Sequence, residues 1–500
     1  MGFKLRSMTL PAWQSFHEDD SKGHQNFVDF EDAEKVKNNC RVLLNREYNY
    51  QNLKKELNEF QLGEKAKSNL NKLIKGEAVV VITGQQPGVL VGPSLVLHKV
   101  LSVITIVSEL KAKGIEAIPI FWNASEDHDL IEISKTTLWQ GDLALTPFRM
   151  QFNELPVSAE KLLWTEELNS LLNEQSDYVK GLLEGCPKRR YADHVTQIML
   201  NLFSHEGLLV IEPNWLRKGQ LPLWEKVDQK HEAIFKAFEK DEAKLVERGE
   251  LLQAERYHGI PVFSIHKETG VRDPFHYDKE GWSKRGKKIK SLLDVLSEGE
   301  KLSPGALLRP AFAQFSLPII ASVLGPAEYQ YHKQNRSVFT ELKLNRPALL
   351  PRLSGVWIPK PLKELCLRFK IEVEELLKGL SFLPNVRYKE KDDFRSEKES
   401  LWNKMSEGLS EDSKADMKIS FELEMKRFED KMLKKLLNLE QKEQGLSRQK
   451  IHNINEFILP KGVRQERLLN PLSFIKDKAH LKAIQKEFIQ SAKMKVRVYE

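Results

Sequence analysis

A chain of 500 residues with 41% hydrophobic and 30% charged residues has the composition of a folded globular protein, which excludes wholesale disorder. At about 150 residues per domain, this length predicts roughly three structural units. The 78 lysines and arginines exceed the 71 aspartates and glutamates by seven, but the basic residues are spread along the chain, so nucleic acid is not an expected partner.

The sequence also argues against a membrane protein and against export. Its apolar runs are interrupted by charged residues or proline, and none approaches the ~20 residues that a membrane span requires. The first residues lack the apolar core of an export signal. The three cysteines, Cys40, Cys186 and Cys366, lack the spacing of metal ligands and fit a reducing compartment. We therefore expect a cytoplasmic protein.

Residues 78–129 predict a βαβ unit around which the rest of the chain is organised. Val79 to Ile82 and Ala117 to Trp122 are short apolar runs typical of strands buried on both faces, and an apolar helix lies between them. The fold class is therefore α/β with a parallel sheet. Because ligands bind beyond the carboxyl ends of such strands, we expect the site in the polar loops that follow them.

Other segments add layers and insertions. Helices are expected over 30–48, 50–74 and 221–252, with two more between 159 and 203. Further strands are expected at 208–211, 261–265 and, once or twice, within 307–324. Residues 136–152 have the pattern of a hairpin, and 267–290 that of an inserted hairpin or loop excursion.

Between 361 and 455 the composition shifts to Glu, Lys, Leu and Met. Apolar residues recur there at steps of four and three, the spacing of a coiled-coil seam: Phe421, Met425, Phe428, Met432, Leu436 and Leu439. A helix over 362–380 could lie antiparallel to this seam, and a second subunit could cover the remainder. A solvated charged helix is the alternative. We predict a coiled-coil domain and a homodimer formed through it.

The loop after the first strand combines glycines with the start of a helix, a favourable place for an anion. It is neither GxGxxG nor a P-loop. His98 belongs to a polar stripe on the helix and is a candidate catalytic residue, the alternative being a core histidine bonded to a backbone carbonyl. Lys99 either serves the site or pairs with an acid. The substrate-binding candidates here are Thr83, Gln85, Gln86, Gly88, Gly92, Ser94 and Lys99.

The second loop places four ionisable residues in a row, the catalytic candidates Glu126, Asp127, His128 and Asp129. They could orient an amine, act as a general base or hold a divalent ion. Helix capping by Asp127 or Asp129 is the alternative. Because contiguous residues rarely close a tetrahedral zinc site, we assign no metal ligand. Further substrate-binding candidates are Asn123 and Ser125 before the acidic run and Glu328 and Tyr329 at a later Gly-Pro helix start.

Six blocks between Thr83 and Asn470 resemble the bacillithiol-biosynthesis cysteine-adding enzymes, or cysteine ligases. They are TGQQPGVLVGP, FWNASEDHD, LSPGALLRP, VLGPAEYQYH, LLPRLS and GVRQERLLN. The resemblance implies a Rossmann-like core over 1–360, related to class I synthetases and nucleotidyltransferases, with inserted connecting segments near 136–206 and 267–300. It also implies a dimerising coiled-coil domain over 361–455 and a segment, 456–500, that returns to the core.

The reaction implied by the resemblance joins L-cysteine to glucosaminyl malate through an amide bond and gives bacillithiol, in the last step of its biosynthesis. We expect the amide to form between a malyl carboxylate and the cysteine amine. That carboxylate must be activated, and our hypothesis is that ATP supplies the activation by adenylylation or phosphorylation. The resemblance also implies a pocket for ATP or ADP, with Gly462, Arg464, Gln465 and Arg467 as candidate contacts. The alternatives are a synthetase-like transferase acting on another amine and a non-enzymatic, nucleotide-gated coiled-coil scaffold.

Overall fold

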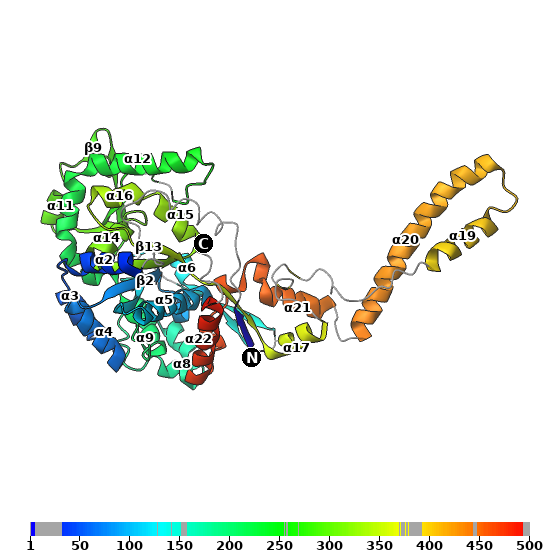
Figure 1. The fold of residues 1–500 in the computed structure, drawn as a ribbon, viewed down its shortest axis with the longest axis horizontal. Helices are drawn as coiled ribbons and strands as arrows, with labels where there is room; N and C mark the ends of the chain where they lie inside the picture. Colours follow the sequence, from blue (N-terminus) through cyan, green and yellow to red (C-terminus); the bar gives the residue numbers. More distant parts are fainter. Residues whose placement is uncertain are drawn as a thin grey trace. The chain divides into compact units, whose positions relative to one another are not determined.

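The computed structural model describes residues 2–5, 33–127, 129–141, 143–151, 158–254, 256, 259–268, 270–369, 371, 376, 379, 393–443 and 448–493 (Figure 1). They form two compact units. The larger comprises 3–140, 145–356 and 466–500, and the smaller is mainly 357–465. None of the described helices is long and apolar enough to cross a membrane.

A five-stranded parallel sheet forms the centre of the larger unit, in the order β13-β12-β2-β3-β6. The strands are β2 (Val79–Gln85), β3 (Ala117–Asn123), β6 (Leu209–Ile211), β12 (Ile319–Leu324) and β13 (Ala348–Pro351). Helix α5 (Ser94–Ala112) connects β2 to β3 and packs against both. The predicted βαβ unit and parallel sheet are therefore confirmed.

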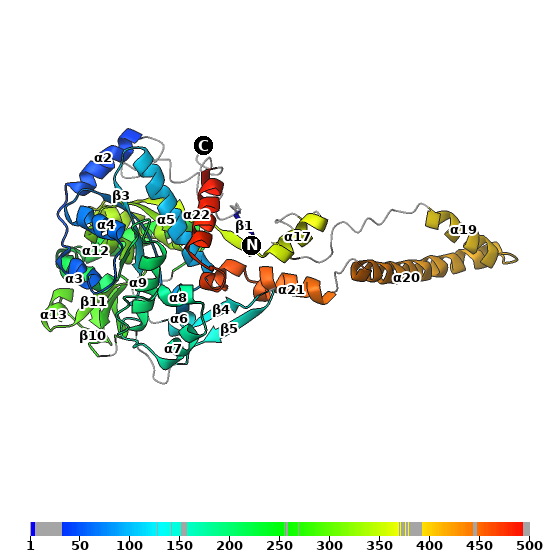
Figure 2. The same ribbon diagram turned by 90° about the horizontal axis from the view of Figure 1, so that it is seen from below.

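Both faces of this sheet are covered, which explains its continuous apolar runs. Helix α2 (Ala33–Leu44) packs against β2 and β12, and α9 (Tyr191–Leu202) packs against β3 and β6. Helix α22 (Lys478–Lys493), near the end of the chain, lies beside α5 (Figure 2). The C-terminal segment thus belongs to the same packed layer as the central βαβ unit.

A second sheet, antiparallel, has the order β10-β9-β8-β7-β11. Its strands are β7 (Val262–Ile265), β8 (Arg272–Asp278), β9 (Gly281–Lys284), β10 (Lys287–Lys288) and β11 (Lys301–Pro304). The excursion predicted over 267–290 is thus a hairpin added to β7. Strand β11 was not predicted, because prolines and glycine obscure its short alternating pattern.

Several predicted elements differ in the structure, and three helices, α7 (Glu166–Asn173), α8 (Asp177–Gly181) and α9, lie where two were expected between 159 and 203. The helix expected over 221–252 is divided into α11 (Leu221–Gln229) and α12 (His231–Glu247), because Lys230 leaves the helical conformation. The first half of 307–324 is a helix, α14 (Arg309–Ser316), and β12 is the one strand of that segment. Leu307, Leu308, Ala311 and Phe312 are buried at helical spacing, and Pro310 fits the first turn of a helix.

The hairpin predicted over 136–152 is β4 (Lys135–Trp139) paired antiparallel with β5 (Leu145–Arg149). The expected helix over 50–74 is divided into α3 (Gln51–Leu57) and α4 (Glu64–Ile74).

The remaining elements of the larger unit are α6 (Leu130–Ile133), α10 (Pro213–Leu216), η1 (Val89–Val91), η2 (Arg217–Gln220), α13 (Leu292–Ser297), α15 (Pro326–Lys333), α16 (Arg336–Glu341), η5 (Pro471–Ser473) and β1 (Gly2–Leu5). Strand β14 (Gly355–Ile358) and the short turn η4 (Gln465–Arg467) lie where the chain passes between units.

The smaller unit is helical and contains α17 (Lys360–Phe369), α19 (Asp393–Met405), α20 (Glu411–Glu443), α21 (Arg448–Ile458) and η3 (Pro460–Gly462). Helices α19 and α20 form a hairpin (Figure 1). The rings of Trp402 and Phe421 lie 5.2 Å apart, and Lys398 Nζ lies 3.7 Å from Glu429 Oε1. Helix α19 therefore packs against part of the expected seam. The helix expected over 362–380 is described as α17 up to Phe369, and the side chains of Leu436 and Leu439 lie outside the described residues.

Candidate functional site

The loops that follow β2 and β3 meet at the carboxyl edge of the parallel sheet. Their strands are paired in register, so that Gln85 lies opposite Asn123. The Ala124 N–H donates to the Gln85 carbonyl at 2.9 Å, and Gln86 Nε2 donates to Asp127 Oδ2 at 3.3 Å. We call the loop over 84–92 the glycine turn and the loop over 123–129 the acidic turn. The two are separate in sequence, but they lie together at one edge of the sheet.

Lys99 joins this edge to a third loop. Its Nζ donates to the Gly84 carbonyl at 2.7 Å, to Gln85 Oε1 at 2.7 Å and to Glu328 Oε1 at 2.8 Å. Glu328 also accepts from the Gly325 N–H at 2.6 Å, at the start of α15. Lys99 is only 2% exposed, and this burial lowers the pKa of its ammonium while Glu328 opposes the shift. Lys99 both pairs with an acid and organises the loops.

His98, the neighbouring residue, pairs with a carboxylate from the C-terminal segment. Its Nδ1 lies 3.1 Å from Glu466 Oε2, and Arg352 holds Glu466 with bonds of 2.9 and 2.8 Å. Burial lowers the pKa of His98 and outweighs the opposing effect of Glu466. Burial alone would raise the pKa of Glu466, but His98 and Arg352 lower it. A neutral imidazole that donates Nδ1–H to an ionised carboxylate agrees with the direction of both shifts.

This pairing differs from the alternative of a core histidine bonded to a backbone carbonyl. Sequence reasoning did not identify Glu466 or Arg352 as site residues. Both residues occur in blocks that carried the family resemblance, GVRQERLLN and LLPRLS. The resemblance therefore pointed to these segments, but it did not indicate what the two side chains do.

The glycine turn is a tightly packed arch rather than an open phosphate cradle. A Cβ on Gly88 would lie 2.8 Å from Gly92 Cα, and Gly92 has a φ of +76°. Leu90 and Val91 also have positive φ, at 47° and 68°, a costly conformation for branched residues. The close approach of the backbone explains why glycines occupy these two positions.

The C-terminal segment holds this arch in place. Asn470 Nδ2 lies 3.0 Å from the carbonyls of Val89 and Leu90 and from Thr136 Oγ1. The Ser94 N–H, at the start of α5, donates to the Leu469 carbonyl at 2.8 Å. One of the free N–H groups of this helix end is therefore occupied, and an anion site at the remaining ones stays a prediction.

The carboxylates of the acidic turn pair with arginines. Glu126 pairs with Arg217 and accepts from Ser303 Oγ at 2.5 Å. Asp127 accepts from Arg309 at 2.6 and 3.2 Å and from Arg272 at 3.2 Å. Burial raises the pKa of Asp127, but the two guanidinium groups outweigh it and bring that pKa down to about 2. Such a carboxylate is a weak base, which disfavours Asp127 as the proton acceptor.

The remaining members of the second loop have different surroundings. Asp129 caps α6, with Oδ1 accepting from the Glu132 N–H at 3.1 Å, as the capping alternative predicts. His128 lies outside the described residues. Among the residues that are described, no three His, Cys, Asp or Glu side chains lie together as potential ligands of a metal ion.

Asn123 and Ser125 fix the end of β3 to neighbouring elements. Asn123 Nδ2 donates to Thr196 Oγ1 at 3.1 Å, and Ser125 Oγ donates to Glu212 Oε2 at 2.7 Å. Glu212 is held by Arg190 through two bonds of 2.8 Å. These contacts hold the loop after β3 against α9 and against the residue that follows β6. Sequence reasoning did not identify Arg190 as a residue of the site.

The other candidates are placed as follows. Thr83 Oγ1 donates to the Val323 carbonyl at 2.8 Å, which links β2 to β12. Tyr329 is buried, and the Lys333 ammonium lies 5.2 Å from the centre of its ring. Both side chains therefore stabilise the edge from inside the fold.

The boundary between the two units falls within the segment that holds the four nucleotide-contact candidates. In the smaller unit, Gln465 bonds the backbone of Trp357 and Phe457, and Gly462 has a φ of +73°. Arg464 is half-buried, and Arg467, which belongs to the larger unit, is exposed. Their role in nucleotide binding stays a prediction.

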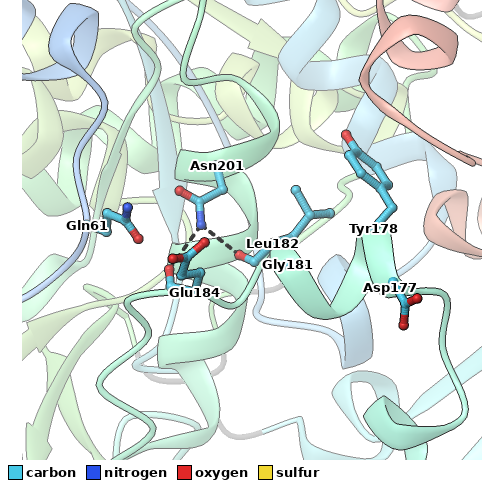
Figure 3. Close-up of a pocket in the computed structure, with 7 residues that line it drawn as sticks. All are labelled: Gln61, Asp177, Tyr178, Gly181, Leu182, Glu184 and Asn201. Atoms are coloured by element: carbon cyan, nitrogen blue, oxygen red, sulfur yellow. Dashed lines mark hydrogen bonds between the residues drawn. The ribbon is translucent and has the colours of Figure 1, made fainter.

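An open hollow of about 430 Å³ lies elsewhere in the larger unit (Figure 3). It is lined by Gln61, Asp177, Tyr178, Gly181, Leu182, Glu184 and Asn201. Asn201 Nδ2 donates to the carbonyls of Leu182 at 2.9 Å and Glu184 at 3.2 Å (Figure 3). None of these residues belongs to the loops at the sheet edge, so we place the candidate site at the edge, where the charged side chains converge.

The chain matches the family model described as "Bacillithiol biosynthesis BshC, N-terminal Rossmann-like domain" over residues 7–353. Among its relatives are proteins named "Putative cysteine ligase BshC". The one from Staphylococcus carnosus strain TM300 is 25% identical over 463 residues, 84% of each chain. Those from Staphylococcus aureus strain MRSA252 and Staphylococcus epidermidis strain ATCC 12228 / FDA PCI 1200 are 26% and 23% identical, with 85% of each chain covered.

Replacing Asn470 by alanine should lower the free energy of unfolding by about 1–3 kcal/mol, because two buried carbonyls lose their donor. Denaturant titration of the full chain measures this change. As a matched control, Asn71→Ala on the exposed side of α4 should change it by no more than about 0.5 kcal/mol. Equal effects of the two substitutions would contradict the bracing role of Asn470.

Asp127 should contribute to stability in a pH-dependent way. Its folded pKa of about 2 lies below the ordinary value of 3.8 for an aspartate, so its contribution is present above about pH 4 and is lost as the pH falls toward 2. The shift corresponds to about 2 kcal/mol. The difference in unfolding free energy between the wild type and Asp127→Asn should narrow as the pH is lowered from 5 to 3. If the difference in unfolding free energy stays constant from pH 5 to 3, the ion pairs of Asp127 with Arg272 and Arg309 do not account for it.

Proposed function

Because this chain belongs to the bacillithiol biosynthesis BshC family, we propose that it is a cysteine ligase that joins L-cysteine to glucosaminyl malate through an amide bond. The observation that carries the proposal is the convergence of the loops after β2 and β12 on Lys99 at the carboxyl edge of the parallel sheet, the edge where α/β enzymes bind their ligands.

Two pairings of amine and carboxyl could give this amide. Glucosaminyl malate carries a sugar amine and malyl carboxylates, and cysteine carries one group of each kind. Three arginines lie at the acidic turn, so the edge is suited to keeping malyl carboxylates as anions. We therefore favour attack of the sugar amine on the cysteine carboxyl, in place of the malyl carboxylate expected from the sequence.

A carboxylate must be activated before an amine attacks it, because oxide is a poor leaving group. We propose that ATP is the activating substrate and supplies an acyl phosphate or acyl adenylate. When the C–N bond forms, the bond from carbon to the phosphate oxygen breaks, and the amine loses a proton. The partly exposed cations Arg217 and Arg309 fit an anionic substrate better than the occupied N-terminus of α5.

Within this proposal, Lys99 positions the edge. The ammonium holds the carbonyl of Gly84 and the side chain of Gln85 against Glu328, so the loops after β2 and β12 keep one geometry. Pre-organised electrostatic groups of this kind commonly account for a large share of rate enhancement. His98 is a second positioning candidate, because its ring is oriented by Glu466.

The purified full chain, supplied with cysteine, glucosaminyl malate and ATP with Mg²⁺, should form a product whose mass and fragmentation show cysteine on the sugar amine. Omitting ATP should abolish it. Lys99→Met should lower kcat/KM by about 100-fold, since a positioned charge is lost and Glu328 is left unpaired. Lys55→Met, on the exposed face of α3, should leave kcat/KM unchanged.

Product formation with another amine only would favour the transferase alternative, and nucleotide binding without turnover would favour the scaffold. Circular dichroism of Lys99→Met separates loss of activity from loss of fold. Wild-type activity in a folded Lys99→Met protein would remove Lys99 from the proposed site.

We further propose that the protein is a cytoplasmic homodimer formed through a coiled coil. Phe428 and Met432 continue the seam on α20 and are 50% and 38% exposed. Phe428→Glu should therefore shift the protein from dimer to monomer in light scattering, because the seam would bury a charge. Ile419→Glu, exposed on α20 but off the seam, is the matched control. A monomeric wild type, or an unaffected Phe428→Glu dimer, would contradict the proposal.

A further inference from the structure

Three arginines from separate elements gather at the acidic turn. Arg217 begins η2, Arg272 begins β8, and Arg309 begins α14. Their side chains are 15%, 5% and 20% exposed. Burial lowers the pKa of Arg217 and of Arg272 to about 10, and in each case a neighbouring arginine adds to the shift. Arg272 and Arg309 bond the same oxygen of Asp127, so these two like charges lie close together.

The carboxylates of the turn do not balance this charge. Glu126 pairs with Arg217, while Asp127 is shared between Arg272 and Arg309. Glu160 lies 4.0 Å from Arg217, at the limit of an ion pair, and the pKa of Lys301 is lowered by burial and by Arg217. The three guanidinium groups are therefore hydrogen-bonded to only two carboxylates, and a buried charge without full compensation is costly.

Donors also remain available on these arginines. Among the residues that the structure describes, Arg217 makes one side-chain hydrogen bond, to Glu126, and Arg309 makes two, both to Asp127. A guanidinium has five N–H donors, so both can accept a further anion. Within the same described set, the buried Nε of Arg272 has no hydrogen-bond partner.

Arg272 is held in place by contacts with the surrounding protein. Its Nη2 donates to the Pro304 carbonyl at 2.9 Å, and its guanidinium lies 4.2 Å from the centre of the Phe263 ring. Arg217 and Arg309 are the more accessible members and pair with the adjacent residues Glu126 and Asp127. A ligand with two anionic groups would match the two accessible guanidiniums and would occupy their remaining donors.

We propose that Arg217 and Arg309, supported by Arg272, bind the two malyl carboxylates of glucosaminyl malate. This assignment rests on the proposed ligase function and identifies the part of the substrate that the edge recognises. Phosphate oxygens share the chemistry of carboxylates, so ATP is the competing source of the anion. The acidic turn holds the guanidiniums in place, and the substrate carboxylates complete their hydrogen bonding.

The first test is a comparison of substrates. The wild type should prefer glucosaminyl malate over glucosaminyl lactate, which lacks one carboxylate, by about 10-fold or more in kcat/KM, the scale of one charge-assisted hydrogen-bonded pair. Arg217→Gln and Arg309→Gln should each reduce this preference and raise the KM for glucosaminyl malate, with the KM for cysteine unchanged. Arg217→Lys should retain part of the preference, because it keeps the charge without the planar fork.

The matched control is Arg285→Gln, which removes an exposed arginine paired with Asp273 in the antiparallel sheet. It should leave the preference intact. A preference for malate that survives in both folded arginine variants would overturn the proposal.

A second measurement is independent of turnover. Calorimetric titration of the full chain with L-malate should show binding that weakens about 10-fold or more in Arg217→Gln and Arg309→Gln, with ATP affinity unchanged. Weakened ATP binding with unchanged malate binding would assign the arginines to phosphate and overturn the proposal. Arginine-dependent malate binding in a protein that ligates nothing would support the subsite and count against the ligase function.

Discussion

The geometry of the candidate site depends on one buried cation. Lys99 is removed from water, which is costly for an ammonium group unless partners replace its hydration. Its partners are a backbone carbonyl and a side chain at the end of β2 and the carboxylate that begins α15. Because β2 and β12 are neighbours in the sheet, this single group fixes the loops after both strands to the same helix.

A second constraint comes from the end of the chain. Glu466 bonds His98, and Asn470 bonds the arch between Gly88 and Gly92, so residues more than 360 positions away hold the central helix and its entry loop. Leu90 and Val91 have positive φ, and such a strained backbone persists only where neighbouring groups hold it in place. The bonds from Asn470 hold this loop in one conformation, and catalysis benefits from groups that need no rearrangement.

The charged groups at this edge differ from those that the sequence led us to expect. The run from Glu126 to Asp129 is acidic in sequence and led to an expected site for an amine. In the fold, Arg217, Arg272 and Arg309 arrive from 91, 145 and 182 residues away and neutralise its first two carboxylates. The pairing of these carboxylates with arginines was therefore decided by elements whose approach has no local signal.

The sequence by itself determined the βαβ unit, the parallel sheet and the convergence of two loops at its carboxyl edge, because strand and helix periodicities are local and parallel strands end on one side. It also determined the family, through blocks spread over the chain. Only the tertiary structure decided that 307–316 is largely helix, that α19 partners α20, and that His98 pairs with Glu466. These outcomes depend on which distant surfaces pack together, and that is set by the free energy of the whole fold rather than by any local pattern.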